Sequence, residues 1–237
     1  MNPFKALIRG ALGKFGYRLT TVTAAEPPLS PLVRRGVDLL FDVGANVGQY
    51  AGCARAEGYA GRIVSFEPLP ETHRQLSLAA AGDPEWRVHA RCALGATAGD
   101  CEINVSANSY SSSLLPLLPA CTDAAPEAAY VATARTPMTT LDAVFGDYWR
   151  RGERAFLKID TQGFERAVLD GAARSLSDIC GVQLELSVKP LYRGQQTYLP
   201  LLSFLEAQGF ELWELIPGFA DPGGERLQFD AILFRPE

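Results

Sequence analysis

Two short stretches carry residues whose types and spacing could bind a ligand. The first, LLFDVGANVGQY (39–50), is an apolar run that leads into Asp42, Gly44, Asn46 and Gly48. Glycine lets the backbone turn tightly and lets a ligand approach it, and a helix starting near Val47 would present free N–H groups. The pattern predicts a ligand-binding turn between a buried strand and a helix. The alternative is a turn that needs glycine and nothing more.

The second stretch, RIVSFEPLP (62–70), ends a strand in Glu67, 19 residues after Gly48. In doubly wound sheets an acid at this position hydrogen-bonds the two ribose hydroxyls of an adenosine. Such an acid suits NAD and S-adenosylmethionine equally. The dinucleotide fingerprint is G-x-G-x-x-G, whereas Gly44 is followed by Ala45 and the next glycine is Gly48. The spacing therefore favours a nucleoside that bears an amino acid over one that bears a pyrophosphate.

The elements that must position these residues alternate along the chain. Strand signals occupy 38–43, 62–67, 86–92, 154–160 and 181–187, and helix signals occupy 47–57, 70–81, 164–176 and 198–208. This alternation predicts an α/β fold, a mainly parallel sheet with helices on both faces. At the end of the chain, FELWELIPG (210–218) and RLQFDAILFRP (226–236) flank a Pro/Gly turn. They predict a terminal hairpin that adds an antiparallel strand.

Composition excludes several classes of protein. The 237 residues are 47% hydrophobic and carry a formal net charge of −5, so the chain can bury one sizeable core and offers nucleic acid no general attraction. The five cysteines are odd in number and include no C-x-x-C pair. They indicate a reducing compartment, and we expect a cytoplasmic protein.

Two segments fall outside this alternation. Residues 100–137 begin like a short strand and continue as Ala-, Ser- and Pro-rich sequence without periodicity, which predicts either a lid or a loose low-complexity segment. Residues 1–20 place apolar side chains at helical spacing with Lys5, Arg9, Lys14 and Arg18 between them. This basic amphipathic helix would pack on the domain or on a second subunit, or would lie on an anionic membrane surface.

Several motifs together resemble the FkbM-type S-adenosylmethionine-dependent methyltransferases. In chain order they are FDVGANVGQYA, VSFEPLPETHRQL, HARCALG, TPMTTLDAVF, FLKIDTQGFERAVLDGA, VQLELSVKPLY and LQFDAILFR. The resemblance implies a Rossmann-like class I methyltransferase fold, with a seven-stranded, mostly parallel sheet and an antiparallel final strand. It divides the chain into an N-terminal helix and linker (1–36) and a methyltransferase domain (37–237) that contains the 100–137 insertion.

The resemblance also implies the cofactor residues. The methionine end of S-adenosylmethionine would be held by Asp42, Gly44, Ala45, Asn46 and Gly48, with Gln49 and Tyr50 beside it. Glu67 would bind the ribose, and the adenine would lie between Pro68 and Leu69 on one side and Ala93 and Leu94 on the other. The product would be S-adenosylhomocysteine. Where the family commonly reads D-x-E-G, this chain has Asp160, Thr161, Gln162 and Gly163, which puts a charged role for the third position in doubt.

Methyl transfer to an aliphatic hydroxyl needs alignment and a base. Asp160 ends the strand FLKID beside the expected position of the sulfur and is the first candidate, with Lys158 two residues back on the same strand face. Glu185 in VQLELS is the second candidate, unless it only holds a neighbouring Arg or Lys. The two acids could instead share a divalent metal, but no compact His/carboxylate motif indicates one.

Acceptor-binding residues are predicted on two segments. The stretch SYSSS supplies Ser109, Tyr110 and Ser112, which would bind acceptor hydroxyls or belong to a solvated loop. The stretch after the fifth strand supplies Lys189, Tyr192 and Arg193, whose aromatic and cationic groups suit a sugar face or a phosphate.

The resulting prediction is a cytoplasmic O-methyltransferase that acts on a sugar hydroxyl of a glycan, glycolipid or natural-product glycoside, as in polysaccharide biosynthesis. The amphipathic N-terminus adds the hypothesis of transient docking at the inner membrane face, or of a homo-oligomer. Two alternatives stay open: a nucleotide-binding oxidoreductase, and a catalytically silent module that binds S-adenosylmethionine.

Overall fold

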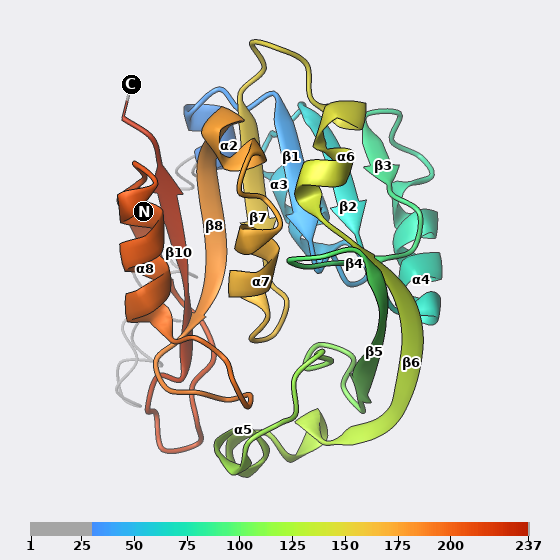
Figure 1. Cartoon of the computed structure of the whole chain (residues 1–237), viewed down its shortest axis with the longest axis vertical. Coiled ribbons are helices and arrows are strands. Elements are labelled where there is room, and N and C mark those ends of the chain that lie inside the picture. The colour runs from blue at the N-terminus through green and yellow to red at the C-terminus, as the bar shows by residue number, and fades with distance from the viewer. Residues whose placement is uncertain (1–29, 237) are drawn as a thin grey trace, which may run out of the picture.

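The main sheet has seven strands. The computed structural model describes residues 30–236, and Figure 1 shows the sheet at the centre of this part of the chain. Its order is β3-β2-β1-β7-β8-β10-β9, and its strands are β1 (Leu39–Val43), β2 (Arg62–Phe66), β3 (Trp86–Val88), β7 (Ala155–Ile159), β8 (Ile179–Ser187), β9 (Glu211–Pro217) and β10 (Gln228–Phe234). Strand β10 pairs antiparallel with β8 and β9, and the remaining pairs are parallel. The predicted fold class, including the antiparallel terminal hairpin, is confirmed.

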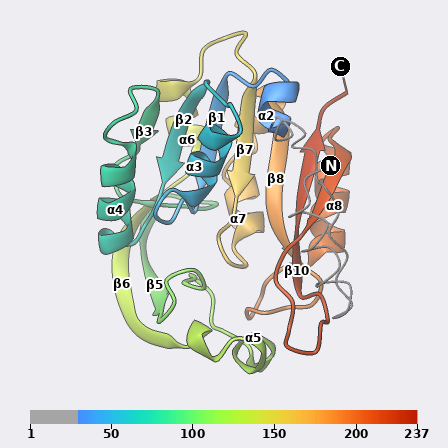
Figure 2. The ribbon, with the colours of Figure 1, turned by 180° about the vertical axis from the view of Figure 1, so that it is seen from behind.

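Helices cover both faces of this sheet, as Figures 1 and 2 show from opposite sides. One face carries α2 (Pro31–Arg34), α3 (Gln49–Ala56) and α4 (Pro70–Ala80), and the other carries α6 (Leu141–Tyr148), α7 (Glu165–Asp170) and α8 (Tyr198–Ala207). Successive side chains of a strand point to opposite faces. In β1, Leu39 and Phe41 accordingly join one buried cluster and Leu40 joins the other.

The helix predictions need one correction and one addition. Helix α7 ends at Asp170 rather than at residue 176, because the carboxylate of Asp142 accepts hydrogen bonds from the backbone N–H groups of Arg174 and Ser175 at 3.0 and 2.8 Å. Those N–H groups are then not available to a continuing helix. Helix α6 was not predicted at all.

The predicted third strand also ends early. Strand β3 stops at Val88, and the residues that follow lead into β4 (Ala93–Leu94), which belongs to a second sheet of order β4-β6-β5. The other two strands of that sheet are β5 (Gly99–Ser106) and β6 (Tyr130–Thr139).

Residues 100–137, predicted to begin like a short strand and to form a lid or a loose segment, belong to a stretch with regular structure. We call this stretch, residues 99–139, the arm. Strands β5 and β6 pair antiparallel within it, with α5 (Pro119–Ala124) and the short helix η1 (Pro126–Ala128) between them. Only one residue of β6, Thr136, is buried, so the strand carries no hydrophobic alternation from which it could have been predicted.

The far end of the arm packs on the main domain. Cys121, Ala125 and Ala128 of the arm form a buried cluster with Leu191 and Tyr192, which follow β8. A β-bridge between Leu117 and Tyr192 adds backbone pairing. The arm therefore spans from the β2 side of the sheet to the β8 side, over the carboxyl ends of the parallel strands (Figure 1).

The described residues cover only part of the segment to which the N-terminal predictions apply. Leu32 of α2 packs into the core of the domain, so residues just before the predicted boundary at 36 contribute to it. The predicted helix over 1–20 lies outside the described residues. Between residues 30 and 236, no helix is both long and apolar enough to cross a membrane.

Candidate active site

A cavity of about 450 Å³ lies between the carboxyl ends of the parallel strands and the arm. The sheet contributes the residues that follow β1, β2 and β7 and inward side chains of β8 and β10. The arm contributes Ile103, Ser109, Tyr110, Ser112 and Leu114. A cavity of this size, with one end apolar and the other polar, suits a nucleoside-sized ligand and the reacting part of a second molecule.

The turn after β1 has the backbone that its glycines predict. Gly44 has a φ of +72°, and a Cβ there would come within 1.9 Å of the Asp160 carbonyl oxygen. Gly48 has a φ of +94°, and a Cβ there would meet the Trp86 ring at 2.7 Å. Both glycines are thus required by conformation and by close packing within the protein. Asn46 is also left-handed, with a φ of 49°.

Glu67 lies against this turn. Its side chain is buried, and its two oxygens accept separate backbone hydrogen bonds, Oε2 from Asn46 N–H at 3.0 Å and Oε1 from Leu69 N–H at 2.9 Å. Burial raises the pKa of Glu67 to about 7, although these two hydrogen bonds act in the opposite direction. The carboxyl is therefore held rigidly and carries a charge that changes near neutral pH.

An apolar slot adjoins Glu67. Phe66, Pro68 and Leu69 line it from the β2 end, and Cys92, Ala93 and Leu94 line it from the segment around β4. The predicted pairs Pro68–Leu69 and Ala93–Leu94 are therefore both present at this end of the cavity. A planar ring system would replace water along apolar surface here.

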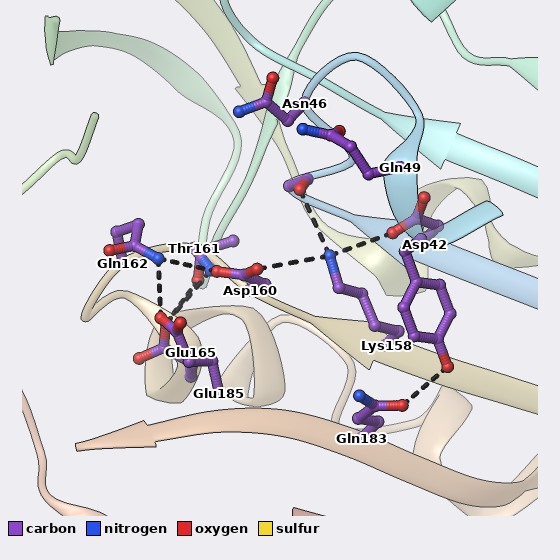
Figure 3. A network of polar contacts seen from close by, with 12 residues as sticks. Asp42, Asn46, Gln49, Lys158, Asp160, Thr161, Gln162, Glu165, Gln183 and Glu185 are labelled. Atoms are coloured by element: carbon purple, nitrogen blue, oxygen red, sulfur yellow. Dashed lines mark hydrogen bonds and ion pairs between the residues drawn. The ribbon is translucent and has the colours of Figure 1, made fainter. Parts of the chain in front are cut away.

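Lys158 is the cation at the polar end (Figure 3). Its Nζ lies 3.2 Å from Asp42 Oδ1 and 3.7 Å from Asp160 Oδ2, and it donates to the Gly44 carbonyl at 3.4 Å. Burial lowers the pKa of Lys158, but Asp42 and Asp160 outweigh burial and leave the pKa raised, so the ammonium stays charged. Asp42 is fully buried beside Lys158 in register between β1 and β7.

A second group of polar contacts continues from Asp160. The Gln162 side-chain amide donates to Asp160 Oδ1 at 2.9 Å and to Glu185 Oε2 at 2.7 Å (Figure 3). Burial, followed by the negative charge of Asp160, raises the pKa of Glu185 well above its usual range. Asp230 of β10 also lines the cavity, and burial raises its pKa to about 6.

Most of the predicted site residues meet at this cavity. It is lined by the predicted catalytic residues Lys158, Asp160 and Glu185, by the predicted cofactor residues Gly44, Ala45, Asn46, Gln49, Tyr50, Glu67, Pro68, Leu69, Ala93 and Leu94, and by the predicted acceptor residues Ser109, Tyr110 and Ser112. Their roles stay predictions. Residues from five strands and the arm therefore converge on one space.

Five predicted site residues lie elsewhere. Asp42 is behind the wall, paired with Lys158, and Gly48 packs on Trp86. Lys189 forms a partly exposed ion pair with Glu225, Tyr192 is fully buried, and Arg193 donates its backbone N–H to the Pro116 carbonyl. The last three do not line this cavity, and their role in acceptor binding stays a prediction.

The sequence analysis assigned no site role to four polar or aromatic residues of the wall. Gln183 accepts a hydrogen bond from the Tyr50 hydroxyl at 2.7 Å, and Asp230 stands opposite Glu185 in the β8–β10 register. Gln162 and Phe164 complete the set. The alternation of β8 offered one signal, because Gln183 and Glu185 fall on the same strand face.

Among residues 30–236, no group of three or more His, Cys, Asp or Glu side chains is placed to hold a metal ion. Within this part of the chain, Asp160 and Glu185 are instead bridged by the Gln162 amide.

Structural comparison shows the fold. A protein from Thermobifida fusca, solved as a candidate methyltransferase, matches with a TM-score of 0.50 at 11% identity, over 86% of this chain and 75% of that one. Magnesium protoporphyrin IX methyltransferase from Synechocystis, with bound SAM, matches at 0.47 and 10% identity, over 86% and 74%. Fibrillarin from Aeropyrum pernix, in complex with S-adenosyl-L-methionine, matches at 0.46 and 11% identity, over 84% and 66%.

Sequence comparison identifies the family. Comparison with curated proteins gave no match. The model of the methyltransferase FkbM domain matches residues 42–212, which is more than half of the chain and includes the turn after β1, Glu67, Asp160 and Glu185. The chain therefore belongs to the FkbM methyltransferase domain family.

Proposed function

We propose that this protein transfers a methyl group from S-adenosylmethionine to a hydroxyl of a sugar. The observation that carries the proposal is a single cavity with Glu67 and an apolar slot at one end and the acids Asp160, Glu185 and Asp230 at the other. The first end fits the nucleoside of the cofactor. The second end fits an acceptor hydroxyl that has to lose a proton.

The residues at the first end fit the cofactor in two respects. Both oxygens of Glu67 already accept a backbone N–H, so the carboxylate is fixed with its remaining lone pairs free for two ribose hydroxyls. The side-chain oxygen of Asn46 is buried without a hydrogen-bond partner among the described residues. An ammonium or hydroxyl group of the ligand would satisfy it. The adenine would lie in the slot between Pro68–Leu69 and Ala93–Leu94.

The bound cofactor supplies an electrophilic methyl group on a sulfonium. An acceptor hydroxyl that took up this methyl group would release S-adenosylhomocysteine and would have to pass its proton to a carboxylate of the wall. We assign that carboxylate to Asp160, whose side chain is 36% exposed and whose Oδ2 faces Lys158. Lys158 holds this carboxylate in place, and a positioned base contributes about 10² to 10⁴ in rate.

The charge of the polar end favours a neutral acceptor. Asp160, Glu185 and Asp230 line it, and Lys158 is the single Lys or Arg among the described residues of the wall. A phosphate or carboxylate on the acceptor would stand beside the negative charges of Asp160 and Asp230 in a partly desolvated space. A neutral sugar hydroxyl avoids this repulsion, which supports the predicted glycan or glycolipid acceptor and polysaccharide biosynthesis as its setting.

A second part of the proposal concerns where in the cell the enzyme works. We propose that the enzyme works in the cytoplasm and meets a lipid-linked acceptor at the inner membrane face through residues 1–20, whose cations are Lys5, Arg9, Lys14 and Arg18. Flotation with liposomes that contain anionic lipid tests this. Loss of flotation on deletion of residues 1–20 would support it, and an unchanged result would contradict it.

Methyl transfer can be tested with radiolabelled S-adenosylmethionine and a panel of neutral sugars, glycosides and glycolipids. Wild type should label at least one of them, and Asp160→Asn should lose about 10²-fold or more in kcat. S-adenosylhomocysteine binding measured on the same samples separates the alternatives. Binding without turnover on any acceptor would indicate the silent module, and binding of NAD with hydride transfer would indicate an oxidoreductase.

A further inference from the structure

The strongest unexplained feature of the site is the side chain of Gln162. It lies between Asp160 and Glu185, the two acids that are candidates for the base (Figure 3). A primary amide has two N–H donors on its nitrogen and an acceptor on its oxygen. Here each donor serves one carboxylate, so the amide nitrogen is fully used by the pair.

A hydrogen bond to its oxygen fixes the orientation of this amide. Gln162 Oε1 accepts a hydrogen bond from the hydroxyl of Tyr192 at 2.7 Å, and Tyr192 is fully buried. The reversed amide would turn its oxygen toward both carboxylates, which is electrostatically unfavourable. Tyr192, which the sequence suggested as an acceptor contact, therefore holds Gln162 instead.

The backbone of Gln162 is constrained as well. Its φ is 54°, a left-handed conformation that costs free energy in residues other than glycine. Its carbonyl accepts from the Ser113 hydroxyl of the arm at 2.7 Å, and Gly163 N–H, the next along the chain, donates to Glu165 at 2.9 Å. Contacts from the arm and from α7 thus hold a strained residue in place, as is common at functional sites.

The two carboxylates receive different second partners. Glu185 Oε2 accepts another amide hydrogen bond, from Gln228 at 2.7 Å, whereas Asp160 Oδ2 faces the Lys158 ammonium at 3.7 Å. Gln162 is the group that they share. Because it is neutral, it brings the two acids together without adding a third negative charge.

We propose that Gln162 is the positioning residue of the acceptor end, a neutral bridge that orients Asp160 and Glu185 toward the acceptor hydroxyl. The catalytic role of Gln162 rests on the proposed function, whereas the hydrogen bonds of the bridge are independent of it. A glutamate at this position would place a third carboxylate against the other two, and the cluster would have to retain a proton to higher pH.

Two variants test the bridge. Gln162→Asn keeps an amide and tolerates a left-handed φ, but it is too short to reach both acids. Gln162→Glu keeps the length and adds the charge. Gln75→Glu is the matched control, because Gln75 donates to Glu71 at 2.9 Å on the exposed face of α4.

The readout is the pH titration of carboxyl ¹³C signals in protein labelled at Asp and Glu. Losing one donor should raise the titration midpoint of Glu185 by about one pH unit in Gln162→Asn, and the extra charge should raise it further in Gln162→Glu. Gln75→Glu should leave it unchanged. Titration curves of Glu185 in both Gln162 variants that superimpose on wild type would overturn the proposal.

Two further measurements separate the bridge from the proposed function. If S-adenosylhomocysteine fails to bind wild type, the proposed function fails while the titration still tests the bridge. If methyl transfer is found, kcat of Gln162→Glu should fall about 10-fold at pH 7 and recover near pH 9. A purely structural defect would lower kcat equally across this range and would contradict a positioning role.

Discussion

The pH dependence of nucleoside binding follows directly from the surroundings of Glu67. Oε2 and Oε1 are both occupied by backbone N–H donors, from Asn46 and Leu69. A proton added to this carboxyl must therefore point toward the ligand, where it replaces an acceptor with a donor. The two ribose hydroxyls need acceptors, so S-adenosylhomocysteine should bind the ionised form.

The magnitude follows from the pKa of Glu67, which burial raises to about 7. At pH 8 about 90% of this carboxyl is ionised, and at pH 5.5 only about 3% is, so the affinity should fall about 30-fold, or about 2 kcal/mol. Glu67→Gln keeps one acceptor and cannot titrate. It should bind more weakly than wild type at pH 8 and should lose most of the pH dependence.

Calorimetric titration with S-adenosylhomocysteine at several pH values measures both effects. Other acids of the cavity titrate in the same range, so the difference between wild type and Glu67→Gln isolates the part due to Glu67. An affinity that stays flat from pH 5.5 to 8 in wild type, or that falls as steeply in the variant, would refute the reasoning.

Four further predictions concern stability and specificity. Gly44→Ala forces a Cβ toward the Asp160 carbonyl at a φ of +72°, so it should abolish S-adenosylhomocysteine binding and lower the Tm; unchanged values by calorimetry and thermal melting would contradict this. Lys158→Met leaves Asp42 buried without its cation, so the free energy of unfolding in urea should fall by about 3–5 kcal/mol. The double variant Lys158→Met, Asp42→Asn should recover part of that free energy. Burial raises the pKa of Glu165 to about 7 and of Asp230 to about 6, so the folded state holds more protons than the unfolded state between about pH 4.5 and 7. The free energy of unfolding, measured by urea titration, should therefore decrease as the pH rises through this window. An increase would contradict the prediction. In competition assays a neutral sugar acceptor should be methylated at least about 10-fold faster than the matching uronate, and equal rates would argue against the charge argument.

The sheet was predictable because its signals are local. Buried parallel strands read as short apolar runs, and the Pro/Gly turn before β10 marked the antiparallel hairpin. The arm was not predictable in the same way. Strand β6 buries only one residue and forms through its pairing with β5, which is a long-range contact without a local pattern.

The site was predictable where the chain order fixes the geometry. Glu67 and Asp160 follow parallel strands, whose carboxyl ends meet at one edge of the sheet. Asp42 is buried and does not line the cavity, because the register of β1 with β7 places it beside Lys158. Tyr192 became a buried support for Gln162, and neither outcome can be read without knowing which strands are neighbours.

Calorimetric titration of wild type with S-adenosylmethionine and S-adenosylhomocysteine, with NAD as the control ligand, tests the central claim most directly. The structure predicts that both sulfur nucleosides bind, that Glu67→Ala weakens both, and that NAD does not bind. If neither nucleoside bound, the assignment of the turn around Gly44 and of Glu67 to the cofactor would be wrong, and the proposed methyl transfer would be wrong with it.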